Sequence, residues 1–154
     1  MAAEPQRPPI CENRRARHEF EILDTLEAGL ALVGSEVKSL RGGKGSIAEA
    51  YVAFEDGEAW LVDSHVQPYP QANRFNHEPR RRRKLLLNQS ERARWAKRVV
   101  EKGLTVVPLR MYFQGPWVKV EIALARGKKL HDKRDAARDR EDRREMDRAM
   151  RGRS

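Results

Sequence analysis

The stretch AYVAFEDGEAWLV, residues 50–62, decides the fold. Two runs rich in apolar, β-branched and aromatic residues lie on either side of the dipeptide Asp56-Gly57. Asp-Gly adopts the positive φ angles that a tight primed turn requires. We therefore predict a β-hairpin at this position and a body built mainly from strands.

Further strands are predicted before this hairpin. Phe20 and Ile22 alternate with glutamates, a pattern typical of a strand with one buried face. Because glycine favours turns, we expect a turn at residues 27–29, followed by a second short strand at residues 30–33.

Two more strands are predicted near the C-terminal end of the body. They cover residues 105–113 and 117–125 and are joined by a turn at residues 114–116. Pro108 cannot donate a backbone hydrogen bond, so it places the first strand at a sheet edge or at a bulge. In the second strand alternate apolar residues share one face, with charged residues opposite.

Capping residues predict two helices. A short helix begins at Ser35, which would serve as its N-cap, and ends at Gly42-Gly43. A longer helix is capped by Asn88, buries Trp95 and ends near Gly103.

About six short strands separated by tight turns favour a small closed barrel, because closure removes exposed strand edges. We predict an OB-like barrel with flanking helices, in preference to an open sheet with helices on one face. The proline-rich residues 1–12 are expected to be disordered, residues 13–126 to form the barrel, and residues 127–154 to form a basic tail.

Charge favours a polyanionic partner. The chain of 154 residues carries a net charge of +9, and residues 126–154 hold 12 Lys/Arg against 7 Asp/Glu. Such an excess suits nucleic acid better than a membrane, because no apolar run is long enough to span a bilayer and no basic amphipathic helix has an aromatic face. A lone Cys11 and the absence of a signal-like segment favour a cytoplasmic protein.

The tail has many helix formers but few apolar residues. Too little surface is available for burial to offset the entropy of ordering the chain. We therefore expect a tail that is mobile alone and becomes helical against a partner.

Motifs for catalysis are missing from the sequence. The four histidines have no paired spacing, so no metal site is predicted, and the glycine-rich residues 42–45 lack the Ser or Thr that a phosphate-binding loop needs after its lysine. No cofactor or enzymatic activity is predicted. The basic run of residues 80–84 fits phosphate binding and a solvated loop equally well, and Arg14, Arg15 and Arg17 add a second basic cluster.

Four motifs in order resemble one bacterial family. They are NRRARH (residues 13–18), GSEVKSLR (34–41), RKLLLN (83–88), and GKK (127–129) with DKR (132–134). Together they are similar to the small protein B, or SsrA-binding protein, family, over roughly residue 13 to the C-terminus.

This resemblance implies a role in trans-translation. Members of the family have an OB-like barrel, bind the tRNA-like domain of transfer-messenger RNA (tmRNA), and bring it to stalled ribosomes together with elongation factor Tu. Their tails enter the vacant mRNA channel of the small subunit and become helical there. They perform no covalent chemistry.

The resemblance also implies two sets of site residues. The RNA-binding set that it implies is Asn13, His18, Glu27, Glu36, Lys38, Leu86 and Gly127, flanked by Lys128 and Lys129. Arg14, from the N-terminal basic cluster, is added to this set. The set in the tail that acts in the ribosome is Asp132, Lys133, Arg134 and Met150. Ala149 is smaller than the usual residue of the family there, and Asp142 stands where an aromatic residue can occur.

Two other functions are compatible with a basic chain of this size. A structural ribosomal or general RNA-binding protein would coat RNA without preferring tmRNA. A nuclease would need clustered carboxylates or a histidine pair, which the sequence does not display. We expect a monomer.

Overall fold

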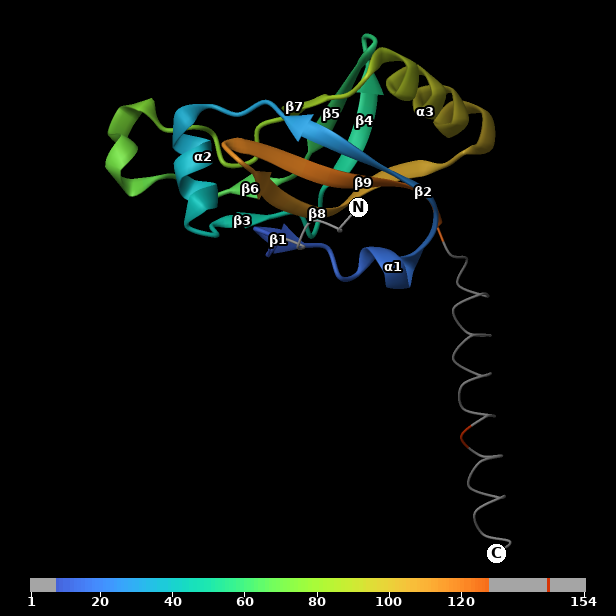
Figure 1. Cartoon of the computed structure of the whole chain (residues 1–154), viewed down its shortest axis with the longest axis horizontal. Coiled ribbons are helices and arrows are strands. Elements are labelled where there is room, and N and C mark those ends of the chain that lie inside the picture. Colours follow the sequence, from blue (N-terminus) through green and yellow to red (C-terminus); the bar gives the residue numbers. More distant parts are fainter. Residues whose placement is uncertain (1–7, 128–143, 145–154) are drawn as a thin grey trace, which may run out of the picture.

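A computed structural model of the chain describes residues 8–127, apart from the side chains of residues 73–75, and residue 144 (Figure 1). Its strands are β1 (Cys11–Glu12), β2 (Phe20–Leu30), β3 (Gly45–Ser46), β4 (Tyr51–Glu55), β5 (Glu58–Val62), β6 (His65–Val66), β7 (Arg83–Leu86), β8 (Thr105–Gln114) and β9 (Trp117–Gly127). Its helices are α1 (Ala16–Glu19), α2 (Gly34–Arg41), the 3₁₀ helix η1 (Pro70–Phe75) and α3 (Gln89–Lys102).

The main sheet closes on itself. Its strands run in the order β1-β8-β4-β5-β7-β2-β9, and β9 pairs again with β8, so that the strands from β8 to β9 form a ring. All pairings in it are antiparallel. The predicted mainly β barrel with flanking helices is therefore confirmed. Two of the strand pairings in this ring are very short. β4 pairs with β8 only at Val52–Val106, and β2 pairs with β7 only at Gly29–Leu86 and Leu30–Leu85.

The hairpins have the geometry that their sequences predict. Asp56 and Gly57 both have positive φ, 53° and 74°, and join β4 to β5 in register. In the β8–β9 hairpin the register shifts between Pro108 and Arg110, so Pro108 lies at a bulge as expected. Val118, Val120, Ile122 and Leu124 of β9 all point into the buried core.

Two helices lie at opposite ends of the barrel in Figure 1. Leu40 of α2 and Trp95 of α3 are both fully buried in the same apolar core. Asn88 caps α3 by accepting hydrogen bonds from Ser90, and Gly103 ends it in the left-handed conformation, as predicted. On α2 the polar Glu36 and Ser39 are buried beside Leu40, and on α3 Val99 is partly buried against the same core as Trp95. Among the described helices, none combines the length and apolar character that a membrane span requires.

The predicted turn at residues 27–29 is wrong. Residues 20–30 form one continuous strand with an irregularity between Ile22 and Asp24, and Ala28 in the supposed turn is buried. Gly29 is needed for close approach: a Cβ at this position would lie 3.3 Å from the Cβ of Leu86 on β7. Gly29 therefore allows close contact with Leu86, 57 positions further along the chain, and does not mark a turn of the chain.

Two other boundaries differ from expectation. The N-cap of α2 is Val33, not Ser35, and the Glu36 carboxylate accepts the Val33 N–H at 3.0 Å, while the Ser35 hydroxyl lies 2.9 Å from Nδ1 of His77. Cys11 and Glu12, which we expected to lie in a disordered segment, pair with Met111 and Arg110 of β8. The ordered body therefore begins before residue 13.

A second, smaller apolar cluster lies on the outside of the barrel. It consists of Ala16 of α1 with Val107, Leu109, Ala123 and Ala125 of β8 and β9, and Phe20 and Ile22 pack against it. Small alanine side chains let α1 approach the strands closely. This cluster fixes the N-terminal basic segment beside the outer face of β8 and β9.

Candidate nucleic-acid interface

The outer face of β2, β9 and β8 carries a row of polar side chains. Glu27 on β2 pairs in register with Glu121 on β9, and Glu121 pairs with Arg110 on β8. The apolar neighbours of Glu121, Val120 and Ile122, point into the barrel, so strand alternation turns this row outward.

Hydrogen bonds and stacking link this row into a network. The Tyr112 hydroxyl donates to Oε2 of Glu27. The Arg110 guanidinium lies over the Tyr112 ring, 4.8 Å from its centroid, and Arg110 Nε lies 3.5 Å from Oε2 of Glu121. Partial burial, and then the hydrogen bond and negative charge of Glu27, raise the pKa of Tyr112. The tyrosine therefore stays a protonated donor at neutral pH.

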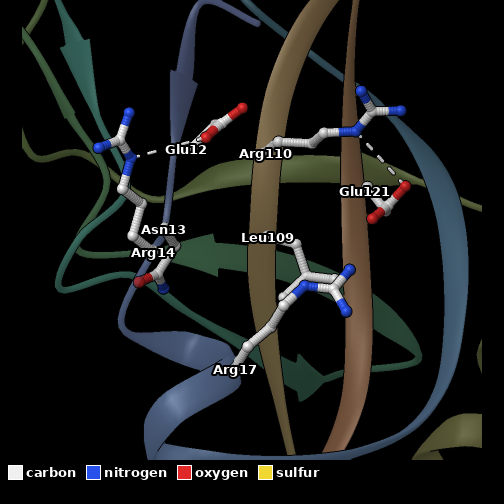
Figure 2. A pocket seen from close by; sticks show the side chains of 7 residues that line it. All are labelled: Glu12, Asn13, Arg14, Arg17, Leu109, Arg110 and Glu121. Atoms are coloured by element: carbon white, nitrogen blue, oxygen red, sulfur yellow. Dashed lines mark ion pairs between the residues drawn. The ribbon is translucent and has the colours of Figure 1, made fainter. Parts of the chain in front are cut away.

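A basic groove of about 490 Å³ adjoins this network (Figure 2). It is lined by Glu12, Asn13, Arg14, Arg17, Leu109, Arg110 and Glu121. Figure 2 shows that Arg14 and Arg110 each face a glutamate, at 3.8 Å and 3.5 Å, whereas Arg17 extends from α1 over Leu109. Within the described part of the chain Arg17 has no carboxylate partner.

The groove is suited to a phosphate backbone. Three arginines against two glutamates leave it with an excess of positive charge. Both ion pairs are long, and the Glu12–Arg14 pair is open to solvent, so that pair costs little to exchange for a phosphate contact. Arginine also matches phosphate by bidentate hydrogen bonding.

Asn13, the first predicted site residue, holds the start of this region in place. Its backbone N–H donates to the Leu109 carbonyl at 2.8 Å, and its Nδ2 donates to the Pro108 carbonyl at 3.2 Å. These bonds tie the segment before α1 to the bulge in β8, while His18 is exposed on α1. The structure thus brings Asn13, Arg14 and Glu27 to one outer face.

Leu86 lies at the end of β7, and Lys38 lies on α2. Leu86 is exposed on β7 beside Gly29, and since residues 27 and 29 alternate to the same face of β2, it continues the face that carries Glu27. Lys38 is exposed on α2, with its Nζ 5.6 Å from the centre of the Tyr69 ring. An exposed apolar side chain and a cation near a tyrosine suit contacts to unpaired bases and phosphates, respectively.

Glu36 is not on this surface. Its side chain is fully buried and accepts hydrogen bonds from Arg81 Nε at 3.1 Å and from Arg83 Nε at 2.5 Å. Burial alone would raise the pKa of Glu36, but the hydrogen bonds from Arg81 and Val33 and the charge of Arg83 hold it below its ordinary value. Glu36 therefore contributes to the site by holding α2 and the segment before β7, not by touching RNA.

The basic run of residues 80–84 is divided between the interior and the surface. Arg83 is fully buried and also donates to Ser64 Oγ at 2.9 Å, while desolvation lowers its pKa. Arg82 pairs with Glu55 at 2.9 Å and stacks on Trp60 at 4.8 Å. Arg80 and Lys84 pair with Glu49 and Glu58. Arg83 is therefore a structural residue of the interior, whereas Arg80, Arg82 and Lys84 form partly exposed ion pairs, for which phosphate binding stays a prediction.

The remaining predicted site residues lie at or beyond the end of the barrel. Gly127 ends β9 and is paired in register with Phe20. Residues outside the described range are Lys128, Lys129, Asp132, Lys133, Arg134 and Met150. Among the described residues, no group of His, Cys, Asp and Glu is arranged to hold a metal ion.

Sequence reasoning missed Tyr112, Arg110 and Glu121. Their signal was the alternation within the two C-terminal strands, which placed Glu121 opposite the apolar face. Alternation along one strand shows which residues lie on the polar face, but it does not show which residues of the adjacent strands lie beside them. Those neighbours depend on the bulge at Pro108, which sets the register of Arg110 against Glu121.

Comparisons with known proteins identify related sequences. Residues 10–152 match the family described as SmpB protein. The chain is 54% identical over 154 residues to the SsrA-binding protein of Desulforudis audaxviator (strain MP104C), which covers 100% of both chains. It is 56% identical over 150 residues to the SsrA-binding protein of Brucella canis (strain ATCC 23365 / NCTC 10854 / RM-666), covering 97% of this chain and 95% of the relative.

A solved structure is similar as well. It is described as "tmRNA-SmpB: a journey to the center of the bacterial ribosome", and one of its chains matches with a TM-score of 0.67 and 50% sequence identity. The match covers 82% of this chain and 93% of the solved one.

Proposed function

Because the chain belongs to the SmpB family, as its four sequence motifs predicted, we propose that it is an RNA-binding adaptor of trans-translation. It binds the tRNA-like domain of tmRNA and brings it to stalled ribosomes. The single observation that carries this proposal is full-length similarity to SsrA-binding proteins at more than half identity. The solved chain at 50% identity, described with tmRNA and the bacterial ribosome, supports the same partners.

The geometry of the barrel supports the RNA-binding half of this role. The basic groove beside Arg17 suits phosphates, and the network around Glu27 and the exposed Leu86 suit bases or sugars. We propose that Asn13, Arg14, His18, Glu27, Lys38, Leu86, Gly127, Lys128 and Lys129 form the RNA-binding face, with Glu36 supporting it from the interior.

The second half of the role belongs to the tail. We propose that residues 130–154, including Asp132, Lys133, Arg134 and Met150, enter the vacant mRNA channel and become helical there. A basic segment suits a channel lined by ribosomal RNA. The adaptor acts as a cytoplasmic monomer, is delivered with elongation factor Tu, and performs no covalent chemistry itself.

A competition titration tests this proposal. The labelled tRNA-like domain of tmRNA is titrated with the full chain at physiological salt, in the presence of an unrelated structured RNA of equal length. Binding that survives excess competitor supports the adaptor role. Binding that the competitor removes would leave a general RNA-coating protein, because phosphate contacts alone do not distinguish sequences.

A further inference from the structure

A cleft of about 270 Å³ lies on the outer side of the barrel, between α1 and the start of β4. Its lining includes the apolar residues Ala16, Phe20 and Val107, the carboxylate residues Glu19 and Glu49, and Tyr51. We propose that this α1 cleft binds the ammonium group of Lys129 in the free protein and thereby docks the first residues of the basic tail on the barrel. The partner that the cleft fits is a segment of the same chain.

The lining of the α1 cleft is suited to a cation. It holds two carboxylates and no Lys, Arg or His, although the whole chain carries a net charge of +9. Glu19 takes part in no ion pair among the described residues, and the pair of Glu49 with Arg80, at 3.4 Å, is open to solvent. Tyr51 is 44% exposed, and an aromatic ring face attracts an ammonium group. Negative charge therefore remains available in the cleft.

The described part of β9 ends beside this cleft. Phe20 and Thr105, which both line it, pair in register with Gly127 and Ala125 at the end of β9. The next residues in the sequence are two lysines, at positions 128 and 129. Two residues of extended chain span at most about 7 Å, so both lysines begin within reach of the cleft.

Strand alternation favours Lys129 over Lys128. Ala123 and Ala125 pack against Ala16 in the smaller apolar cluster beneath α1. Arg126 lies on the other face of β9 and pairs with Glu21 at 3.2 Å. An extended continuation of β9 carries residue 129 to the face of Ala125 and the cleft, and residue 128 to the face of Arg126. Lys129 is thus the ligand, and Lys128 is its matched control.

Docking of this kind links the tail to RNA binding. The link rests on the proposed function, in which Lys129 belongs to the RNA-binding face. Ion pairs that are open to solvent contribute little stability, so RNA phosphates can take Lys129 from the cleft. RNA that engages Lys129 therefore releases the first residues of the tail from the barrel.

Amide relaxation of the free protein tests the docking without RNA. The full ¹⁵N-labelled chain is compared with the Glu19→Gln/Glu49→Gln double variant, Lys129→Gln, Lys128→Gln and, as a charge control outside the cleft, Glu101→Gln on α3. We expect order parameters of residues 128–130 above about 0.6 in the wild type and below it in the double variant and in Lys129→Gln. Lys128→Gln and Glu101→Gln should match the wild type. Salt at about 1 M should reproduce the loss, because it screens exposed pairs.

Three results would overturn the inference. They are order parameters that are already low in the wild type, equal values in the wild type and the double variant, and equal effects of Lys128→Gln and Lys129→Gln. An unchanged value in Lys129→Gln would likewise assign the cleft to another occupant, such as a basic segment of a second protein. Unchanged amide shifts in β8 and β9 verify that each variant keeps the fold.

A double-mutant cycle with the tRNA-like domain of tmRNA tests the link to RNA. Removing Glu19 and Glu49 should strengthen binding about threefold more in the chain with Lys129 than in the Lys129→Gln background. The long-range effect of removing two negative charges is the same in both backgrounds and cancels. Equal gains would show that docking and RNA binding are independent. If the relaxation result holds but the wild type shows no preference for the tRNA-like domain, the proposed function fails and the docking stands, so the two failures are distinguishable.

Discussion

Glu36 is a fully buried charged side chain that lies in the interior between two arginines. Its carboxylate accepts hydrogen bonds from Arg81 and Arg83, and Arg83 has no exposed surface. Breaking a buried ion pair by neutralising one partner leaves an uncompensated charge and typically costs about 3–5 kcal/mol. We therefore expect Glu36→Gln to lower the free energy of unfolding by roughly 3 kcal/mol, measured by urea denaturation at pH 7.

The matched control for this change is Glu49→Gln. Glu49 also pairs with an arginine of the same run, Arg80, at 3.4 Å, but that pair is open to solvent. An exposed pair is worth about 0–1 kcal/mol, so this variant should unfold within about 0.5 kcal/mol of the wild type. Equal losses in the two variants would contradict the structural role of Glu36.

The pH dependence of stability provides a second prediction for Glu36. Its pKa is lower in the folded state than the ordinary value of 4.5, so the unfolded chain binds a proton more readily. The stabilisation from this carboxylate is therefore complete above about pH 4.5 and is lost as the pH falls through the folded pKa. Urea denaturation from pH 7 to pH 3 should show a smaller loss of stability in Glu36→Gln than in the wild type. If the free energies of unfolding of the two proteins fall in parallel with pH, Glu36 does not contribute in this way.

A substitution at Gly29 tests the close approach of β2 to Leu86 on β7. A Cβ at this position meets the Leu86 Cβ at 3.3 Å, which forces the two backbones apart at the short β2–β7 pairing. We expect Gly29→Val to destabilise the barrel by about 1–3 kcal/mol and to weaken RNA binding by shifting Leu86. Gly34→Ala is the control, since a Cβ there meets no atom within 4 Å. Similar melting temperatures for both variants would show that this pairing tolerates the added side chain.

Secondary-structure elements with a local signal were predictable from the sequence. The hairpin at Asp56-Gly57 and the caps of α3 at Asn88 and Gly103 depend on residues within a few positions of one another. Elements that depend on distant contacts were not. Gly29 suggests a turn because its partner Leu86 is far along the chain, and the ion pairs of Arg81 and Arg82 could not be predicted because their carboxylates, Glu36 and Glu55, are distant in sequence.

The candidate site, too, could be predicted from the sequence only in part. Asn13 and Glu27 were predicted by family resemblance and Arg14 from its basic cluster, and the structure brings them to one outer face. Resemblance alone could not show that Glu36 is buried, nor that Tyr112 contacts Glu27. Both facts arise from the order of strands around the ring, which fixes the neighbours of each side chain.

At the scale of elements, we expect the packing of α3 on the barrel to depend mainly on one side chain, that of Trp95. Trp95 is fully buried at one end of the barrel, whereas Val100 on the same helix is largely exposed, at 84%. We expect Trp95→Ala to cost about 3–5 kcal/mol, because it removes a large apolar side chain and leaves a cavity. Val100→Ala should change the free energy of unfolding by less than about 0.5 kcal/mol in the same urea experiment. A small loss for Trp95→Ala would mean that α3 contributes little to the core.

At the scale of the whole molecule, the proposed function separates RNA binding by the barrel from ribosome entry by the tail. Cutting the chain after Leu130 keeps the described body and Lys128 and Lys129, and removes most of the charged residues of the tail. We expect the truncated protein to bind the tRNA-like domain within about threefold of the full chain, since few phosphate contacts are lost. In a reconstituted translation system with a message lacking a stop codon, it should fail to support tagging of the stalled product. A loss of affinity as large as the loss of tagging would contradict this division, because the tail would then be part of the RNA-binding surface.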